Sequence, residues 1–171
     1  MTTTSRLSDY LPYKRQYLSD PDRPQPTGAP LTASVTTEGR AGVRKIRIRD
    51  HQIISDSGVA GGGSDFGPIP GELAIAALGG CLSHGWIMQA ALAGITLDYL
   101  RIDVSTASAP DDSGAPASLE YSVTVESDAS PEKLDEILAL VAEKSWVHRL
   151  LVNPVEIRGT LTSVPTEGAT R

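Results

Sequence analysis

Hydrophobic and polar positions along the chain follow two different periods, and their order predicts the secondary structure. In residues 43–49, Ile46 and Ile48 alternate with basic residues, a period of two that is typical of a half-buried strand. Other segments share this alternation or are rich in strand-forming residues. The five predicted strands are residues 31–37, 43–49, 100–105, 121–126 and 154–164.

Two segments instead have helical character. Apolar residues in 131–144 recur at i, i+3, i+4 and i+7, after a Ser130-Pro131 pair that suits a helix start. Residues 70–95 are apolar nearly all round, which predicts a helix buried on every side. Each glycine costs a helix about 1 kcal/mol relative to alanine. The cluster Gly79, Gly80 and Gly85 therefore predicts close packing by another element, for example the same helix of a symmetry mate.

The remaining segments set the organisation of the chain. Residues 5–18 could form a short helix, although a proline at position 12 disfavours it, and residues 20–30 carry four prolines and resemble a linker. We therefore expect an N-terminal arm and linker over 1–30, one domain over 31–164, and a disordered tail over 165–171. Short turns between strands favour an α+β fold of largely antiparallel sheet with helices on one face.

Residues 55–70 form a long glycine-rich segment. Glycine runs cradle phosphates when a following Lys and Ser or Thr complete the site, and neither follows here. This segment is therefore predicted to be a flexible loop and not a phosphate site.

Composition excludes several classes of function. The net charge of −6 and the absence of long basic runs argue against nucleic acid. Residues 70–95 approach membrane length, but this stretch contains polar residues and glycines that favour a buried helix, so no membrane partner is expected. They are Glu72, Ser83, His84, Gln89 and glycines 79, 80, 85 and 94. Residues 1–9 lack the apolar core of a secretory signal, which predicts a cytoplasmic protein.

The single cysteine, Cys81, excludes an intrachain disulfide and paired-cysteine zinc sites. Three histidines add no recognised metal spacing, so neither metal nor cofactor is expected. Cys81 is a reactive thiol only if a cation or a helix N-terminus stabilises its thiolate, and otherwise it is an inert buried residue. His84 falls on the same helical face and could pair with it, although a core or interface role is favoured. A structural role is also favoured for His148.

Three stretches together resemble the OsmC/Ohr family. They are residues 67–73 (GPIPGEL), 76–84 (AALGGCLSH) and 143–149 (EKSWVHR). In that family a P-x-E-L-L-x-A-A-L-x-x-C helix precedes a K-C-P-V-H-R segment, and the similarity extends over about residues 31–164. The resemblance implies an intertwined homodimer with two buried central helices back to back and sheets outside. It also implies reduction of organic hydroperoxides by two cysteines, helped by an Arg and a Glu.

This chain departs from that pattern at two positions. Cys81 matches the first, peroxide-attacking cysteine, but Ser145 stands where the second, resolving cysteine belongs. Gly71 stands at the position of the Glu, with Glu72 one residue away. The Arg comes from an early strand, where Arg44, Arg47 and Arg49 are all available, and we take Arg47 as the candidate.

The resemblance and the departures lead to two hypotheses. The first is an OsmC-like redox or oxidative-stress protein. It would reduce a small hydrophobic hydroperoxide with one cysteine, Cys81, assisted by Arg47 and Glu72, and an external thiol would complete each cycle. The alternative is a non-catalytic dimer that binds a small hydrophobic ligand.

Overall fold

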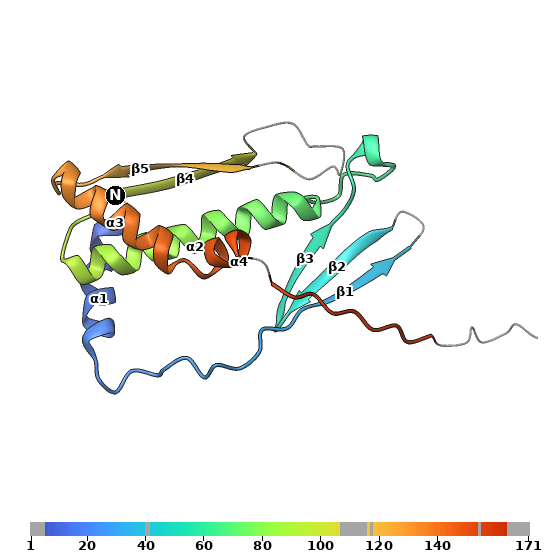
Figure 1. Cartoon of the computed structure of the whole chain (residues 1–171), viewed down its shortest axis with the longest axis horizontal. Coiled ribbons are helices and arrows are strands. Elements are labelled where there is room, and N and C mark those ends of the chain that lie inside the picture. The colour runs from blue at the N-terminus through green and yellow to red at the C-terminus, as the bar shows by residue number, and fades with distance from the viewer. Residues whose placement is uncertain (1–5, 40–41, 107–115, 117, 154, 164–171) are drawn as a thin grey trace, which may run out of the picture.

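The computed structural model describes residues 6–39, 42–106, 116, 118–153 and 155–163 (Figure 1). Four α-helices and five strands form an α+β fold, as predicted. The elements are α1 (Leu7–Ser19), β1 (Ser34–Glu38), β2 (Val43–Ile48), β3 (His51–Ser55), the short 3-10 helix η1 (Val59–Gly61), α2 (Pro70–Ala93), β4 (Tyr99–Thr106), β5 (Leu119–Glu126), α3 (Pro131–Lys144) and α4 (Trp146–Val152).

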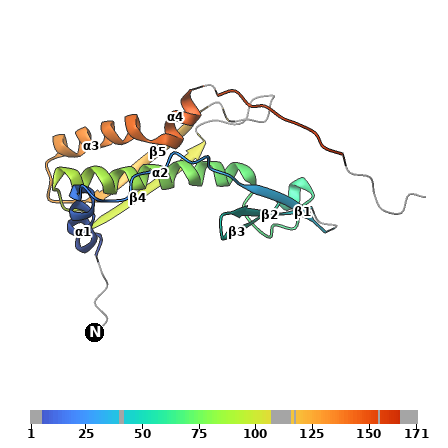
Figure 2. The ribbon, with the colours of Figure 1, turned by 90° about the horizontal axis from the view of Figure 1, so that it is seen from below.

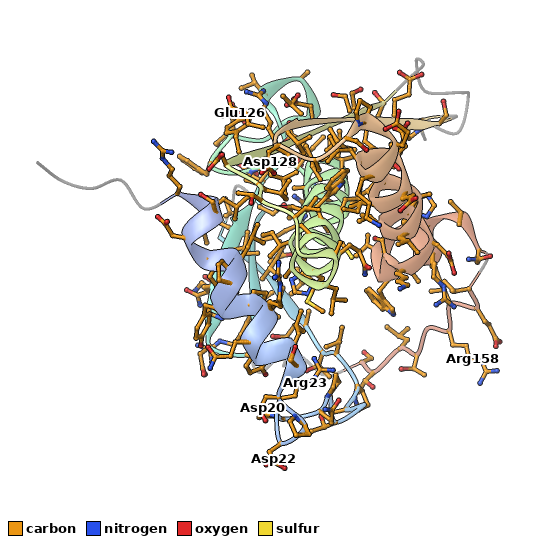
Figure 3. The ribbon with its side chains drawn as sticks, turned by 90° about the vertical axis from the view of Figure 1, so that its left-hand side faces the viewer. Asp20, Asp22, Arg23, Glu126, Asp128 and Arg158 are labelled. Atoms are coloured by element: carbon orange, nitrogen blue, oxygen red, sulfur yellow. The ribbon has the colours of Figure 1, made fainter. Side chains whose placement is uncertain are left out.

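Helix α2 lies at the centre of the main body. It packs against α1, α3, α4 and strand β4. Figure 3 looks along α2 and shows it between α1 and α3, with the β4–β5 sheet over it. The core is formed by buried residues of α2 together with Leu11 of α1, Leu97, and Ile137 and Val141 of α3.

The prediction that α2 is buried on every side is wrong within one chain. Its buried residues are Leu78, Leu82, Trp86, Ala90 and Ala91, which follow one side of the helix. Ala74, Ala77 and Gly80 on another side are exposed. The described chain supplies elements for only part of the circumference of α2, so an apolar stripe stays uncovered.

Close packing at the glycines of α2 is confirmed at two of three positions, and its cause lies within the chain. A Cβ on Gly79 would lie 3.3 Å from Val104 of β4, and a Cβ on Gly85 would lie 3.0 Å from Val141 of α3. Nothing lies within 4 Å of a Cβ built on Gly80. Gly79 therefore allows β4, and Gly85 allows α3, to approach α2 closely.

The alternation predicted for the middle strands is confirmed. β4 and β5 form a two-stranded antiparallel sheet that pairs Tyr99 with Glu126 and Thr106 with Leu119. Half-buried and exposed residues alternate along both strands, because one face covers α2 and the other faces solvent. The predicted start of α3 is also confirmed, since Ser130 Oγ accepts a hydrogen bond from the Lys133 N–H.

A second sheet, of three antiparallel strands in the order β1-β2-β3, extends beyond the N-terminal end of α2 (Figures 1 and 2). The sequence patterns did not predict β3. It follows β2 through a two-residue turn in which Arg49 adopts a left-handed conformation, φ 54°. This turn lacks the Asn-Gly or Asp-Gly pair that usually marks a tight hairpin. All five residues of β1 are exposed, so this sheet has little cover from its own chain.

The last predicted strand, over 154–164, is not formed in this chain. Its described residues, 155–163, have no regular structure, and Ile157 and Leu161 are about 90% exposed. A strand needs a hydrogen-bonding edge, and this segment meets none in its own chain. Directly before it the chain forms α4, a short helix that the patterns missed. The loop 107–116, apart from Pro116, and the predicted disordered tail 165–171 lie outside the described residues.

The N-terminal arm forms a helix despite Pro12, and it packs onto the body. Leu11 of α1 is buried in the core. Arg15 Nε donates a 2.8 Å hydrogen bond to the Ala91 carbonyl near the C-terminal end of α2, where a positive charge is favourable. These contacts stabilise α1 even though Pro12 lacks an N–H donor. The domain boundaries suggested by sequence stay a prediction, but residues 7–19 contribute to the core of the main body.

The glycine-rich loop after β3 is held by a buried carboxylate, Asp56, which is 1% exposed. Asp56 accepts hydrogen bonds from the backbone N–H groups of Ser57, Ser64 and Phe66 at 2.7–3.2 Å. A Cβ on Gly63 would lie 1.9 Å from the Ser57 carbonyl oxygen, so this close turn requires glycine. The sequence predicted a flexible loop, and it did not identify Asp56 as the group that holds the loop in place.

Helix α2 is long and apolar enough to cross a membrane by length and composition alone. Its contacts give a different explanation, because it packs as the core helix between α1, α3 and β4. The expectation of a packed core helix is met on the sides of α2 that these elements cover.

The stability of this loop should depend on pH through Asp56. The hydrogen bond from the Phe66 N–H lowers the pKa of Asp56 below its ordinary value. Burial opposes this shift, and the other two N–H groups and the charge of Arg44 add to it. A carboxyl whose pKa is lowered on folding stabilises the folded protein at pH values above the pKa that the carboxyl has in the unfolded chain, about 4. This contribution is lost as the pH falls further. We expect Asp56→Asn to lower the melting temperature at pH 7 and to flatten the fall below pH 4. Asp65→Asn, in the same loop but exposed, is the control and should behave like the wild type. An Asp56→Asn protein as stable as the wild type at pH 7 would contradict the anchoring role.

Candidate functional site

Cys81 lies near the middle of α2 and borders a cavity of about 300 Å³ between α2 and the α3–α4 corner. Its side chain is partly exposed, so it is neither sealed in the core nor fully at the surface. The cavity is lined by Cys81, His84, Gly85, Met88, Gln89, Val141, Lys144, Ser145 and Trp146. The lining comes from two segments that are far apart in sequence, and packing of α3 on α2 brings them together.

A helix pair places Ser145 beside Cys81. Ser145 Oγ donates a 3.1 Å hydrogen bond to Cys81 Sγ. One helical turn away, Val141 packs against Gly85, so the contacts 81–145 and 85–141 are successive rungs of two antiparallel helices. The missing side chain at Gly85 allows α3 to come close enough for the hydroxyl to reach the sulfur.

Ser145 is also held in place by its own backbone and hydroxyl. It is 4% exposed and lies at the corner where α3 ends and α4 begins. Its N–H donates to the Val141 carbonyl at 2.9 Å, and its hydroxyl accepts from the His148 N–H at 3.3 Å. Because the hydroxyl already accepts one bond, its own hydrogen is free to point at the sulfur of Cys81.

Several lining residues were not singled out by sequence. His84 had been considered, and His84 and Met88 follow Cys81 at i+3 and i+7 on one face of α2. Gln89 lies beside them. Lys144 and Trp146 come from the α3–α4 corner, and Trp146 is 59% exposed at the cavity. Helical spacing from Cys81 could have identified Gln89, whereas only the fold shows that Lys144 and Trp146 face the same space.

Glu72 lies away from this cavity. It is nine residues before Cys81, which puts it about 13 Å along α2 and about half a turn round the helix. Its carboxylate accepts the Ile69 N–H at 2.9 Å and so caps the start of α2. It also borders a different cavity, of about 360 Å³, that faces Ile102 and Val104 of β4. Its assistance to Cys81 stays a prediction.

The three candidate arginines all lie on β2 or its turn, apart from Cys81. Arg44 Nη2 donates to Ser57 Oγ at 3.2 Å, and its charge acts on Asp56, so Arg44 helps to hold the glycine-rich loop. Arg47 and Arg49 are exposed. β2 is not among the elements packed against α2, and no arginine lines the cavity beside Cys81. A role for Arg47 at Cys81 therefore stays a prediction.

The other residues considered have structural contacts. His148 contributes its backbone N–H to Ser145, and Trp86 is buried in the core. Among the residues that the structure describes, no three His, Cys, Asp or Glu side chains come together as a metal site would require.

The arrangement can support chemistry at sulfur. The sulfur of Cys81 accepts the hydrogen bond of the Ser145 hydroxyl. Met88, Val141 and Trp146 give the cavity an apolar wall, and Gln89, His84 and Lys144 offer polar groups. A partly exposed thiol beside a small cavity with such a wall suits a small, mostly apolar reactant.

Solved structures with the same fold carry related names. An OsmC-like protein from Mycoplasma pneumoniae superposes with a TM-score of 0.64 at 15% identity, covering 73% of this chain and 89% of that one. A putative osmotic stress induced and detoxification response protein from Psychrobacter arcticus gives 0.62 at 16% identity, covering 76% and 93%. An organic hydroperoxide resistance protein OsmC from Legionella pneumophila gives 0.55 at 13% identity, covering 74% and 92%. At these identities the similarity establishes the fold alone.

The sequence itself identifies the family. No curated protein matches the chain at a significant level. The family model described as OsmC-like protein matches residues 61–159, which include all of α2, the Cys81 cavity and the α3–α4 corner. The match covers more than half of the 171 residues. The chain therefore belongs to the OsmC-like protein family.

Proposed function

We propose that this protein is a one-cysteine organic hydroperoxide reductase of the oxidative-stress response, with Cys81 as the nucleophile. The observation that carries this proposal is the placement of Cys81, the single cysteine of the chain, at an open, apolar-walled cavity with a hydroxyl donor 3.1 Å from its sulfur. Membership of the OsmC-like family and the fold shared with a hydroperoxide resistance protein support it. We also propose that the protein is cytoplasmic.

The first step is attack of the Cys81 thiolate on the distal oxygen of the hydroperoxide. The O–O bond breaks, the alkoxide takes a proton and leaves as an alcohol, and Cys81 becomes a sulfenic acid. The apolar wall formed by Met88, Val141 and Trp146 suits the organic part of the hydroperoxide. The Ser145 hydroxyl donates a hydrogen bond to the attacking sulfur.

The second step needs a thiol from outside the chain. Ser145 occupies the place from which a resolving cysteine would reach Cys81, and a hydroxyl cannot form a disulfide with the sulfenic acid. The chain contains no other cysteine. An external thiol must therefore reduce the sulfenic acid and regenerate Cys81.

We further propose that the working form is a homodimer. Exposed Ala74, Ala77 and Gly80 leave an apolar stripe along α2, and monomeric proteins rarely expose continuous apolar surfaces. The β1–β3 sheet and the apolar residues of segment 155–163 also lack cover. A second copy of the chain can cover all three, and it is also the source from which Arg47 could reach Cys81.

The fate of the sulfur tests the peroxidase proposal. With a small excess of cumene hydroperoxide and no thiol, the sulfenic acid has no partner and should oxidise further to sulfinic acid. Intact-mass spectrometry should show a gain of two oxygen atoms on Cys81, and added glutathione should suppress it. A Cys81→Ala protein should gain neither oxygen. If Cys81 neither oxidises nor accepts an alkylating reagent under native conditions, the alternative of a non-catalytic dimer that binds a small hydrophobic ligand is the better description.

Restoring a cysteine at position 145 tests the role assigned to Ser145. Cys81 Sγ and Ser145 Oγ lie 3.1 Å apart, so a small side-chain shift brings two sulfurs to the 2.05 Å of a disulfide. We expect Ser145→Cys treated with one equivalent of hydroperoxide to lose two hydrogens and both free thiols. Its turnover with a dithiol reductant should exceed that of the wild type at least tenfold, because the resolving thiol is then intramolecular.

The control for this variant is Ser83→Cys, two residues from Cys81 on α2. Residues at i and i+2 of a helix do not face each other, so this variant should keep its turnover and form no intrachain disulfide. Equal behaviour of Ser83→Cys and Ser145→Cys would contradict the geometry of the site.

Sedimentation equilibrium tests the homodimer. At low micromolar concentration the wild type should have twice the chain mass of 18.0 kDa. Ala77→Glu places a charge on the uncovered stripe of α2 and should shift the protein toward monomer. Ala139→Glu, on the exposed face of α3, is the matched control and should remain dimeric. A wild-type protein that sediments as a monomer would rule out the dimer.

A further inference from the structure

The cavity beside Cys81 has a positive wall in an acidic protein. The chain carries a net charge of −6, yet no Asp or Glu is among the residues that line this cavity. Lys144 lines it from the end of α3, and His84 lines it from α2. Within the part of the chain that the structure describes, Lys144 makes no ion pair, whereas Lys45 and Lys133 each bind a glutamate. The cation at this cavity is therefore available to a ligand.

The other charged groups near the corner do not cancel this charge. Glu143 precedes Lys144 on α3, is exposed, and is absent from the cavity wall. Arg149 follows on α4 and adds further positive charge. The opposite wall, from α2, contributes Cys81, Met88 and Gln89, none of which is acidic. An anion that enters the cavity meets cationic and neutral groups only.

We propose that the external thiol is a small anionic one, whose carboxylate binds Lys144 while its sulfur attacks Cys81. This inference rests on the proposed function and names its second substrate class. A volume of about 300 Å³ admits a small molecule and excludes a folded protein. Ser145 covers one side of the sulfur, so the attacking thiol approaches from the cavity, whose lining includes Lys144 and His84.

The resolving step balances with two molecules of this thiol. The first attacks the Cys81 sulfenic acid, the S–O bond breaks, a mixed disulfide forms and water leaves. The second attacks the mixed disulfide at the sulfur of the bound thiol. It releases the oxidised small disulfide and returns Cys81 to the thiolate, so the small thiol is oxidised and the hydroperoxide is reduced. Lys144 binds and orients the thiol in both attacks, and it does not exchange a proton.

A charge series of small thiols tests the proposal. Cys81 is oxidised with one equivalent of cumene hydroperoxide and mixed with 3-mercaptopropionate, 2-mercaptoethanol or cysteamine, which are anionic, neutral and cationic. Rates of mixed-disulfide formation, followed by quenched intact-mass spectrometry, are corrected for the thiolate fraction of each reagent and for the intrinsic nucleophilicity of its thiolate, which rises with the thiol pKa. We expect 3-mercaptopropionate to react about three- to fivefold faster than cysteamine, the size of an exposed ion pair. Added salt should reduce this preference.

Two lysine variants assign the preference to one residue. Lys144→Gln should lose the charge preference, with the three corrected rates becoming equal. Lys133→Gln, on the same helix but paired with Glu136, should keep the preference of the wild type. Equal rates for the three thiols in the wild type, or a preference that survives in Lys144→Gln, would overturn the proposal.

A peroxide-free measurement separates this inference from the peroxidase proposal. The Cys81 thiol is reacted directly with 3,3′-dithiodipropionate and with cystamine, the disulfides of the anionic and cationic reagents. A faster reaction with the anionic disulfide that depends on Lys144 supports the anion site even if hydroperoxide fails to oxidise Cys81. If sulfenic acid forms normally but neither assay shows a charge preference, the peroxidase proposal stands and the anion site does not.

Discussion

A helix of 24 residues that is apolar on all sides has to be covered, and the rest of this structure is arranged around that requirement. β4 covers one side of α2 and α3 covers another, each brought close by a glycine, Gly79 and Gly85. α1 covers the C-terminal end, where Arg15 also bonds a carbonyl of the helix. The side of Ala74, Ala77 and Gly80 has no cover within the described chain. The β1–β3 sheet and residues 155–163 share this shortage of partners among the described residues, and the homodimer that we propose would cover all of these surfaces.

The candidate site is a consequence of the same packing. Because Gly85 lets Val141 approach α2, the next turn of the helix pair brings Ser145 to Cys81. Ser145 is fixed there by ending one helix and starting the next, so its hydroxyl has little freedom to turn elsewhere. A packing contact one turn from the chemistry thereby sets the distance between the sulfur and its hydrogen-bond donor.

A hydroxyl at this position changes what the site can do. A cysteine at 145 would convert the sulfenic acid to a disulfide within the chain, whereas Ser145 offers a hydrogen bond and no covalent partner. In the proposed cycle, reduction then depends on a molecule that enters the cavity, and the properties of that cavity decide which molecule it is. Its wall is apolar at Met88, Val141 and Trp146 and positive at Lys144, which suits an organic hydroperoxide first and a small anionic thiol afterwards.

The sequence by itself determined the local features of this protein. Alternation identified β2, β4 and β5, the Ser130-Pro131 start identified α3, and the motif around Cys81 identified the family. These succeed because periodicity, capping and short motifs depend on residues near each other in the chain. β3 was not predicted because its turn has no tight-hairpin signature. The strand expected over 154–164 is absent from the described residues 155–163 because strand-forming residues need an edge to pair with. Only the tertiary structure decided that Arg44 is engaged by the loop of Asp56, and that Lys144 and Trp146 share a cavity with Cys81. The physical reason is that these relations join different elements, in the case of Cys81 and Ser145 64 residues apart, and the distance between those two is set by how closely α3 packs on α2 rather than by any local pattern.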